Sequence, residues 1–367
     1  MDGFRYSAWI GACMAPVIWA GELLYRCLPV AVFLLVFLLS CEATCRFGEY
    51  FFPQVLREDV VRDTALGWRT QPDYRFSGEL RDASDRLHHV EIAIDANGFR
   101  EFGTRKGALR ILCVGDSYTF AKDVSQEETY YSVAGELAPA DVFACGTPGH
   151  SSLQEFLVLD RWLDKVDPDA VVWQFCWNDF IGNDLRLARS STKNKCRTLQ
   201  PFLSPEESVF YATPGGGLLR NCRLPAASAF LRDLAVWTDD RTEPVRAEDT
   251  IETRIERGDP KALELLHESL HTTDRIMAMV RARCGDRPII AFDVNGTPPY
   301  HETFQQICGR HQITFLENVA VRIWKASTNG ETVCAGDGAH WSAAAHRICG
   351  EALAGMLSEM GKEPQGG

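Results

Sequence analysis

The chain has 367 residues and carries 38 Lys and Arg against 50 Asp and Glu, which gives a formal net charge of −12 at pH 7. This acidic balance excludes a nucleic-acid-binding protein, because neutralising phosphates requires a clustered excess of Lys and Arg. With 46% hydrophobic and 24% charged residues, the composition also excludes disordered and collagen-like chains. The length exceeds one average domain.

The apolar residues are most concentrated near the N-terminus, where residues 27–41 carry no charge. This run is shorter than the roughly 20 residues of a membrane-spanning helix, but it becomes long enough if it starts at Leu23 and Arg26 reaches the interface. We therefore predict that residues 1–48 form a membrane anchor or signal segment and that the remaining chain is extracytoplasmic, in the periplasm or at the cell surface. A cleaved signal peptide, lipidation at Cys41 and a buried core helix remain open alternatives.

Residues 49–108 are predicted to form a strand-rich lead-in. Polar and apolar residues alternate from His89 to Asp95, and the turn signal Ala96-Asn97-Gly98 follows. Such a pattern is typical of a strand and a turn. His88 and His89 fit the polar edge of this strand better than a pair of metal ligands.

From residue 109 to residue 360, short apolar runs alternate with helical patterns. Strands are expected at 109–114, 142–145, 170–176, 288–293 and 313–316, and helices at 126–137, 153–166, 260–284, 302–310 and 342–360. Continuous apolar strands separated by amphipathic helices predict an α/β protein with a central parallel sheet covered on both faces. The pattern fails at about 190–259, where we expect a loop-like insertion, and residues 361–367 are expected to form a tail.

The chain contains 13 cysteines, nine of them downstream of the apolar segment, so they cannot all pair within one chain. Cys113, Cys145 and Cys176 fall in or at the end of predicted strands, where a free Cys behaves as a small hydrophobic residue. Cys196 and Cys222 flank part of the insertion and are the pair that we would test for a disulfide, although sequence cannot fix the connectivity. The absence of CxxC spacing argues against a zinc ribbon.

Polar segments follow the predicted strands at their carboxyl ends, where ligand sites lie in open parallel sheets. The segments are Gly115-Asp116-Ser117, Cys145-Gly146-Thr147-Pro148-Gly149, Trp177-Asn178-Asp179 and, before the last helix, Asp337-Gly338-Ala339-His340-Trp341. A lone Gly-Asp-Ser is weak evidence, because a turn or helix-capping serine has the same pattern. The specific feature is the set of four segments in this order.

These four segments resemble the four blocks of the SGNH (GDSL) hydrolase superfamily, over about residues 111–354. Asn97-Gly98-Phe99-Arg100 also resembles a segment that often precedes the first block in bacterial members. The resemblance implies a flavodoxin-like three-layer α/β/α sandwich. It further implies hydrolysis of an O-acyl ester of a carbohydrate or another small ester, without a metal or cofactor.

The resemblance also implies a role for individual residues. Ser117 would be the nucleophile, His340 the general base, and Asp337 the group that orients the imidazole. The oxyanion hole would consist of the backbone N–H groups of Ser117 and Gly146 and the side-chain amide of Asn178.

Two tryptophans adjoin these residues. Trp177 and Trp341 are expected to contribute to the substrate pocket, whereas core packing is expected for Trp162 and Trp173. The sequence departs from the common family pattern at Ala121, Ala144 and Trp341. The Asp-x-x-His-Trp-Ser sequence is similar to a branch of acyltransferases that modify cell-surface polysaccharides, so transfer to a sugar hydroxyl stays open beside hydrolysis.

A competing motif, His267-Glu268-Ser269-Leu270-His271, matches the HExxH pattern on a predicted helix. Histidines at i and i+4 share a helix face and could bind zinc, with Glu268 activating water. No third ligand follows at a recognised spacing, and a solvated helix face has the same pattern. A zinc peptidase and a catalytically inactive carbohydrate-binding scaffold are therefore the less favoured alternatives.

Overall fold

The computed structural model describes residues 27–48, 55–103, 109–191, 199–214, 228–231, 234, 250–298 and 300–360. Cys196 and Cys222, the pair predicted for a possible disulfide, lie outside these ranges. The expected tail at 361–367 lies outside them too.

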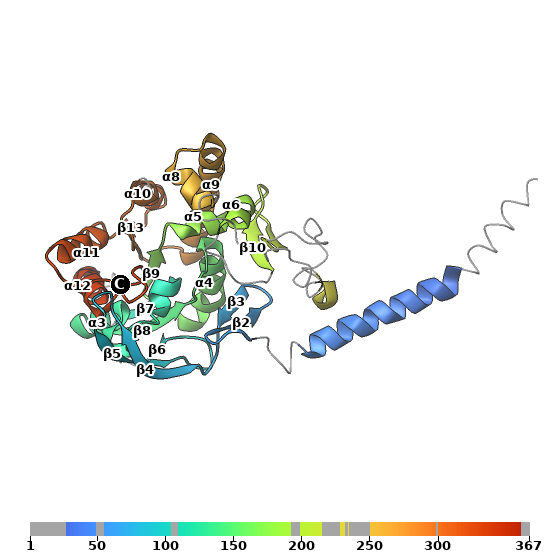
Figure 1. Cartoon of the computed structure of the whole chain (residues 1–367), viewed down its shortest axis with the longest axis horizontal. Coiled ribbons are helices and arrows are strands. Elements are labelled where there is room, and N and C mark those ends of the chain that lie inside the picture. The colour runs from blue at the N-terminus through green and yellow to red at the C-terminus, as the bar shows by residue number, and fades with distance from the viewer. Residues whose placement is uncertain are drawn as a thin grey trace, which may run out of the picture.

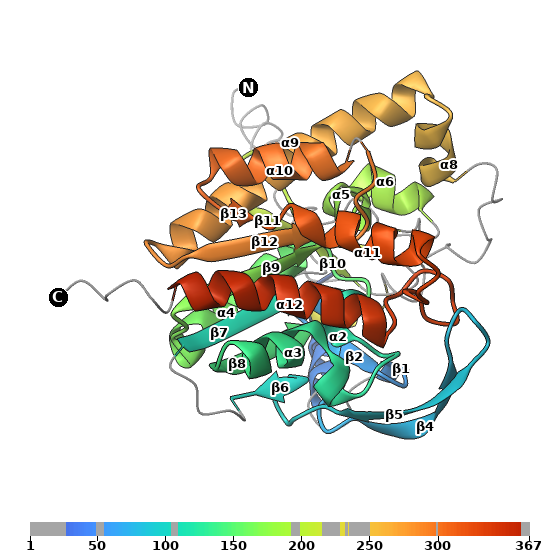
Figure 2. The same ribbon diagram turned by 90° about the vertical axis from the view of Figure 1, so that its left-hand side faces the viewer.

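A six-stranded sheet forms the centre of the molecule (Figures 1 and 2). In spatial order its strands are β13 (Thr314–Phe315), β12 (Ile289–Asp293), β9 (Ala170–Phe175), β7 (Leu109–Gly115), β8 (Ala140–Gly146) and β6 (Glu101–Phe102). All pairs are parallel except that of β6 with β8. Numbered along the chain, the parallel strands β8, β7, β9, β12 and β13 follow the flavodoxin-like order 2-1-3-4-5.

Helices cover both faces of this sheet, as Figure 2 shows. One face packs against α3 (Tyr130–Leu137), α11 (Asn318–Thr328) and α12 (Ala343–Met360), and the other against α4 (Ser152–Val166), α9 (Pro260–Cys284) and α10 (Tyr300–Arg310). Side chains alternate between the two cores along β7, since Ile111 belongs to one apolar cluster and Leu112 to the other. The predicted α/β/α sandwich with a central parallel sheet is confirmed.

The strand register aligns the carboxyl ends of the three central strands. Gly115 at the end of β7 pairs with Gly146 at the end of β8, and Val114 pairs with Trp173 of β9. The polar segments that follow these strands therefore meet at one edge of the sheet. In addition, β9 and β12 are buried along their whole length, which explains their continuous apolar sequences.

Strands also form ahead of the central sheet. β1 (Val55–Arg57), β2 (Val60–Asp63) and β3 (Gly67–Thr70) make a small antiparallel sheet, and β4 (Arg75–Arg81) and β5 (Leu87–Ala93) make a long hairpin. The hairpin end reaches the loop before α12, where the Ala83 N–H donates to the Cys334 carbonyl.

Short elements in the 178–256 region were only partly expected. They are α5 (Asn178–Asn183), α6 (Leu185–Ser190), the hairpin of β10 (Gln200–Leu203) with β11 (Val209–Ala212), and α8 (Ile251–Glu256). The prediction of a loop-like character is wrong for 200–212. The hairpin forms there because Phe202 is buried and its ring packs 5.9 Å from that of Phe210.

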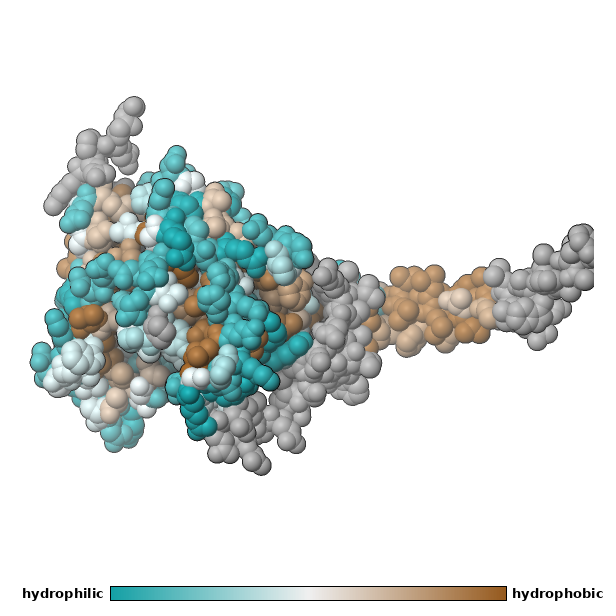
Figure 3. All heavy atoms as spheres, turned by 90° about the horizontal axis from the view of Figure 1, so that it is seen from above, coloured by the Kyte–Doolittle hydropathy of each residue, from teal (hydrophilic) through white to brown (hydrophobic). Residues whose placement is uncertain are grey.

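The apolar N-terminal segment is a helix, Cys27–Gly48, that projects from the globular part (Figure 1). Its 22 residues are long and apolar enough to cross a membrane, and none of its apolar window is buried. Figure 3 shows the resulting hydrophobic surface. Near its C-terminal end, Glu42 accepts hydrogen bonds from the Ser228 hydroxyl and the Ala229 N–H. A long, apolar and unburied helix near the N-terminus is typical of both a membrane anchor and a signal sequence.

Candidate active site

Ser117 begins the single helical turn α2 (Ser117–Phe120) directly beyond β7. The Asp116 side chain caps this turn by accepting from the Tyr118 N–H at 3.0 Å, and Ala121 ends it in the left-handed conformation with φ 54°. Gly115 allows this close turn, because an added Cβ would lie 2.3 Å from the Thr119 hydroxyl in α2 and from the Gln174 side-chain oxygen in β9. The sequence thus presents Ser117 at the carboxyl edge of the sheet.

His340 and Asp337 lie beside this serine. The His340 Nε2 atom is 2.9 Å from the Ser117 Oγ atom, and the His340 Nδ1 atom is 2.5 Å from the Asp337 Oδ2 atom. Partial burial tends to raise the pKa of Asp337, but hydrogen bonds from the His340 ring and from the N–H groups of Ala339 and His340 hold that pKa well below its usual value. An ionised Asp337 fixes the imidazole proton on Nδ1, which leaves Nε2 free to accept the serine proton.

The loop that carries these two residues is held by its own hydrogen bonds. The Asp337 Oδ1 atom accepts from the backbone N–H groups of Ala339 and His340, each at 3.0 Å. The Tyr118 hydroxyl donates to the Ala339 carbonyl at 3.0 Å, and the Tyr118 ring lies 5.2 Å from the His340 ring. The turn with Ser117 and the loop with His340 are therefore tied together.

A cavity of about 290 Å³ opens over the serine, and we call it the serine cavity. Its lining includes Ser117, Lys122, Gly149, Trp177, Asn178 and His340. Residues from all four predicted segments or their immediate neighbours thus converge on one space. Trp177 is half-buried in the lining of the cavity, and its ring lies 5.6 Å from that of Tyr300.

The position of Gly146 differs from the one predicted for an oxyanion-hole residue. Gly146 is buried beneath α2 and does not line the serine cavity, and an added Cβ would clash with the Phe120 backbone nitrogen. Its small size instead lets α2 pack closely on β8. Gly149, three residues later, lines the serine cavity with φ 78°, a backbone conformation that favours glycine. Asn178, at the start of α5, also lines the serine cavity, and its Oδ1 atom is buried without a hydrogen-bond partner among the described residues.

Trp341 does not reach the serine cavity, so its predicted contribution to the pocket is wrong. Its side chain is buried in the core, where it stacks on Phe292 at a ring distance of 6.2 Å. The reason is an isolated bridge between Cys334 and Trp341, which places the tryptophan on the side of the loop that faces α12.

Arg100 supports the turn that carries Ser117, a role that was not predicted. Its buried guanidinium donates to the carbonyls of Phe120 at 2.7 Å, Ala121 at 2.6 Å and Val124 at 2.6 Å. These carbonyls belong to the end of α2 and the turn beyond it. The sequence marked this position only through the Asn97-Gly98-Phe99-Arg100 segment. Its resemblance to other family members did not indicate what Arg100 contacts.

Three buried carboxyl groups lie behind the site. Burial raises the pKa of Asp116, Glu155 and Asp179, which also repel one another. Asp116 caps α2, the Asp179 Oδ2 atom accepts from the Cys176 N–H at 3.4 Å, and neither Glu155 oxygen has a hydrogen-bond partner among the described residues. Asp116 and Asp179 thus hold the backbone on either side of the site, at the turn of Ser117 and at the end of β9.

The HExxH residues lie on α9. The Nε2 atoms of His267 and His271 are 3.0 Å apart, and Glu268 forms an ion pair with Arg186. Within the described ranges, the one group of three or more His, Cys, Asp and Glu side chains close enough to share a metal ion is Asp123, Asp337 and His340. The described residues thus give the histidine pair no third ligand of these types, and Glu268 is held by an arginine.

No protein-family model matches this sequence, and no curated protein matches it. Similar solved structures include a lipolytic protein of the G-D-S-L family from Veillonella parvula, with 13% identity over 67% of this chain and 96% of that chain and a TM-score of 0.33. An esterase from Pseudoalteromonas has 12% identity over 68% and 97%, with a TM-score of 0.37. A mutant acetyl-xylooligosaccharide esterase from Geobacillus stearmophilus has 13% identity over 68% and 94%, with a TM-score of 0.35. The solved structures that this chain is similar to thus include G-D-S-L lipolytic proteins and esterases.

Proposed function

We propose that this protein is a serine esterase that hydrolyses an O-acyl ester of a carbohydrate or another small alcohol. The observation that carries this proposal is the unbroken hydrogen-bonded series from Ser117 through His340 to Asp337, which opens into the serine cavity. A nucleophile, a base and an orienting carboxylate within hydrogen-bond reach are the requirements of acyl transfer through a covalent intermediate.

The geometry supports a two-step reaction. In the first step the Ser117 Oγ attacks the ester carbonyl carbon while its proton passes to His340 Nε2, and the tetrahedral intermediate collapses as that proton moves to the departing alcohol oxygen. In the second step water attacks the acyl-serine, His340 takes a proton from the water, and the acid leaves as Ser117 regains its proton. Asp337 stabilises the imidazolium that forms in each step.

The negative charge of the tetrahedral intermediate needs hydrogen-bond donors. The candidates are the backbone N–H groups of Ser117 and Gly149 and the side-chain amide of Asn178, because all three residues line the serine cavity. Gly149 replaces Gly146 in this role because Gly146 is buried under α2. Removing one such donor typically costs about 2.7–4 kcal/mol of transition-state stabilisation.

Transfer of the acyl group to a sugar hydroxyl is the alternative outcome of the same acyl-serine. It is supported by the Asp-x-x-His-Trp-Ser sequence from Asp337 to Ser342, which is similar to that of acyltransferases acting on cell-surface polysaccharides. Products from an acyl donor with and without an acceptor glycan distinguish the two reactions, since transfer gives an acylated glycan and hydrolysis gives a free acid.

We also propose that the apolar helix Cys27–Gly48 attaches the enzyme to a membrane, with the catalytic part outside the cytoplasm. The support is the length of the helix and its lack of burial. Up to Cys45 the sequence has three acids and two bases, so a charge of −11 belongs to the remainder, which an anionic membrane surface would repel. Attachment must therefore come from the helix.

The test of the esterase proposal is the ester turnover of the Ser117→Ala variant. We expect kcat to fall by more than about 1,000-fold, because the nucleophile is lost while the rest of the site remains.

A further inference from the structure

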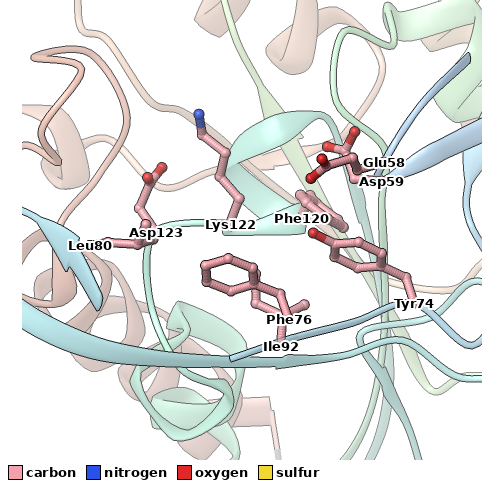
Figure 4. Close-up of a pocket in the computed structure, with 9 residues that line it drawn as sticks. All are labelled: Glu58, Asp59, Tyr74, Phe76, Leu80, Ile92, Phe120, Lys122 and Asp123. Carbon is pink, nitrogen blue, oxygen red and sulfur yellow. The ribbon is translucent and has the colours of Figure 1, made fainter. Parts of the chain in front are cut away.

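A second cavity, of about 380 Å³, lies between the β4–β5 hairpin and the turn that follows α2, and we call it the hairpin cavity (Figure 4). Its apolar walls come from both sides. Phe76 and Ile92 belong to the hairpin and Phe120 ends α2. The volume is in the range of small-molecule sites and is sufficient for one ring-sized group.

Polar side chains surround these apolar walls. Figure 4 shows Glu58 and Asp59 near the hydroxyl end of Tyr74, and Lys122 and Asp123 on another side of the cavity. The Asp123 Oδ2 atom is buried and has no hydrogen-bond partner among the described residues. The cavity thus combines an apolar wall with three carboxyl groups, one ammonium group and one phenol hydroxyl.

The hairpin cavity adjoins the serine cavity. Lys122 lines both cavities, and its Nζ atom is 3.6 Å from the Asp337 Oδ2 atom. A carboxylate oxygen of Asp123 and a ring nitrogen of His340 lie within 4.8 Å of each other. The hairpin cavity therefore lies on the histidine side of the site, whereas Asn178 and Gly149 line the serine cavity alone.

We propose that the hairpin cavity binds the alcohol part of the ester, and that this alcohol is a neutral sugar. The inference rests on the proposed esterase function. His340 must deliver its proton to the departing alcohol oxygen, so the alcohol leaves on the histidine side. The acyl group and its carbonyl oxygen then occupy the serine cavity.

The charges in the hairpin cavity select among alcohols. Glu58, Asp59 and Asp123 repel phosphorylated or acidic alcohols, and Lys122 opposes a fixed cation. A sugar ring offers hydroxyl donors to the carboxylates and an apolar C–H face to Phe76. It therefore matches both the polar and the apolar parts of the cavity.

The test compares two acetate esters in the wild-type protein and two variants. Methyl 6-O-acetyl-glucoside would place its sugar in the hairpin cavity, whereas the ethanol of ethyl acetate is too small to reach Phe76. We expect Phe76→Ala to lower kcat/KM for the sugar ester by about tenfold or more and to change that for ethyl acetate by less than about twofold. Leu87→Ala, an exposed leucine on the same hairpin, is the matched control and should change neither value.

Equal losses on both esters, or no loss on either, would overturn the inference. The inference would also be overturned if acetylcholine were the better substrate and its turnover depended on Glu58 and Asp59. That result would assign the cavity to a cation.

Binding of methyl glucoside to the Ser117→Ala protein, followed by NMR, separates this inference from the proposed function. We expect methyl glucoside to bind to Ser117→Ala and to Ser117→Ala/Leu87→Ala, but not to Ser117→Ala/Phe76→Ala. Absence of binding to Ser117→Ala would contradict the inference. If binding behaves as expected while wild-type ester turnover equals that of Ser117→Ala, the esterase proposal fails and the sugar site stands.

Discussion

At the scale of single residues, the support behind Ser117 depends on one buried arginine. Arg100 directly precedes β6 in the sequence. Its guanidinium donates to three backbone carbonyls at the end of the turn that carries the serine. A planar guanidinium has five N–H donors in a fixed fork, which an ammonium group cannot reproduce. The conformation of α2 therefore depends on the identity of this residue as well as on its charge.

We expect Arg100→Lys to lower the free energy of unfolding by about 2 kcal/mol or more, because at least one buried carbonyl loses its donor. Urea denaturation followed by circular dichroism measures this change. Arg81→Lys, at a half-exposed position on β4, is the control and should stay within about 0.5 kcal/mol of the wild type. A similarly small change in Arg100→Lys would show that these hydrogen bonds do not matter for stability.

Residue identity in the sequence could predict Ser117, His340, Asp337 and Asn178 as neighbours, because each follows a strand or precedes a helix in a fixed order. It could not separate Gly146 from Gly149. Gly146 ends β8 and Gly149 lies three residues later, and only the course of the turn decides which one faces the serine. The side of the loop on which Trp341 lies was equally undetermined, because it depends on one bridge to Cys334.

At the scale of elements, the β4–β5 hairpin supports the loop that carries Asp337 and His340. The hairpin end and the loop are joined by the bridge between Asp82 and Ala335 and by the Ala83 N–H, which donates to the Cys334 carbonyl. Gly336 lies at this contact, and an added Cβ would be 2.5 Å from the Arg81 carbonyl oxygen. Backbone atoms cannot move aside cheaply, so a side chain there would displace the loop.

We expect Gly336→Ala to reduce kcat by about tenfold to a hundredfold, because small displacements of catalytic groups are costly. Steady-state kinetics on a small ester measures the effect. Gly355→Ala on α12, where an added Cβ meets nothing within 4 Å, is the control and should leave kcat unchanged. If Gly336→Ala retained full kcat, the hairpin would not be supporting the loop that carries Asp337 and His340.

Elements with strong local signals were predictable from the sequence. The helix α9 has the predicted bounds because Asp259 caps its first turn, Pro260 starts it and Gly285 follows its end. The hairpin of β10 and β11 was missed because Pro201 lies within it and its strands are short. Its stability comes from packing of Phe202 that no local pattern reveals.

At the scale of the whole molecule, buried histidines couple folding to pH. Burial lowers the pKa of His150 to about 4 and that of His346 to about 3, from an ordinary value of 6.5. Unfolding exposes both rings, which then bind protons below pH 6.5. The unfolded state therefore binds more protons in this range, and these two groups make stability fall as the pH falls from about 6.5 toward 4. The buried carboxyls Asp116, Glu155 and Asp179 act with the opposite sign, because their raised pKa values favour protonation in the folded state.

A variant comparison isolates the histidine contribution. Between pH 7 and pH 5, we expect the wild type to lose about 2 kcal/mol more unfolding free energy than His346→Gln, because the variant has no ring to protonate. Denaturant titrations at several pH values measure this difference. His89→Gln, at an exposed position on β5, should follow the wild-type pH dependence. Parallel curves for wild type and His346→Gln would contradict a neutral buried His346.

The central claim is that Ser117 is the nucleophile of an esterase, and the turnover of a small ester by Ser117→Ala tests it most directly. The matched control is Ser77→Ala, at an exposed serine on the β4–β5 hairpin, and circular dichroism verifies that both variants are folded. The account predicts wild-type turnover in Ser77→Ala and a loss of more than about 1,000-fold in Ser117→Ala. Turnover in a folded Ser117→Ala protein equal to that of the wild type would contradict it.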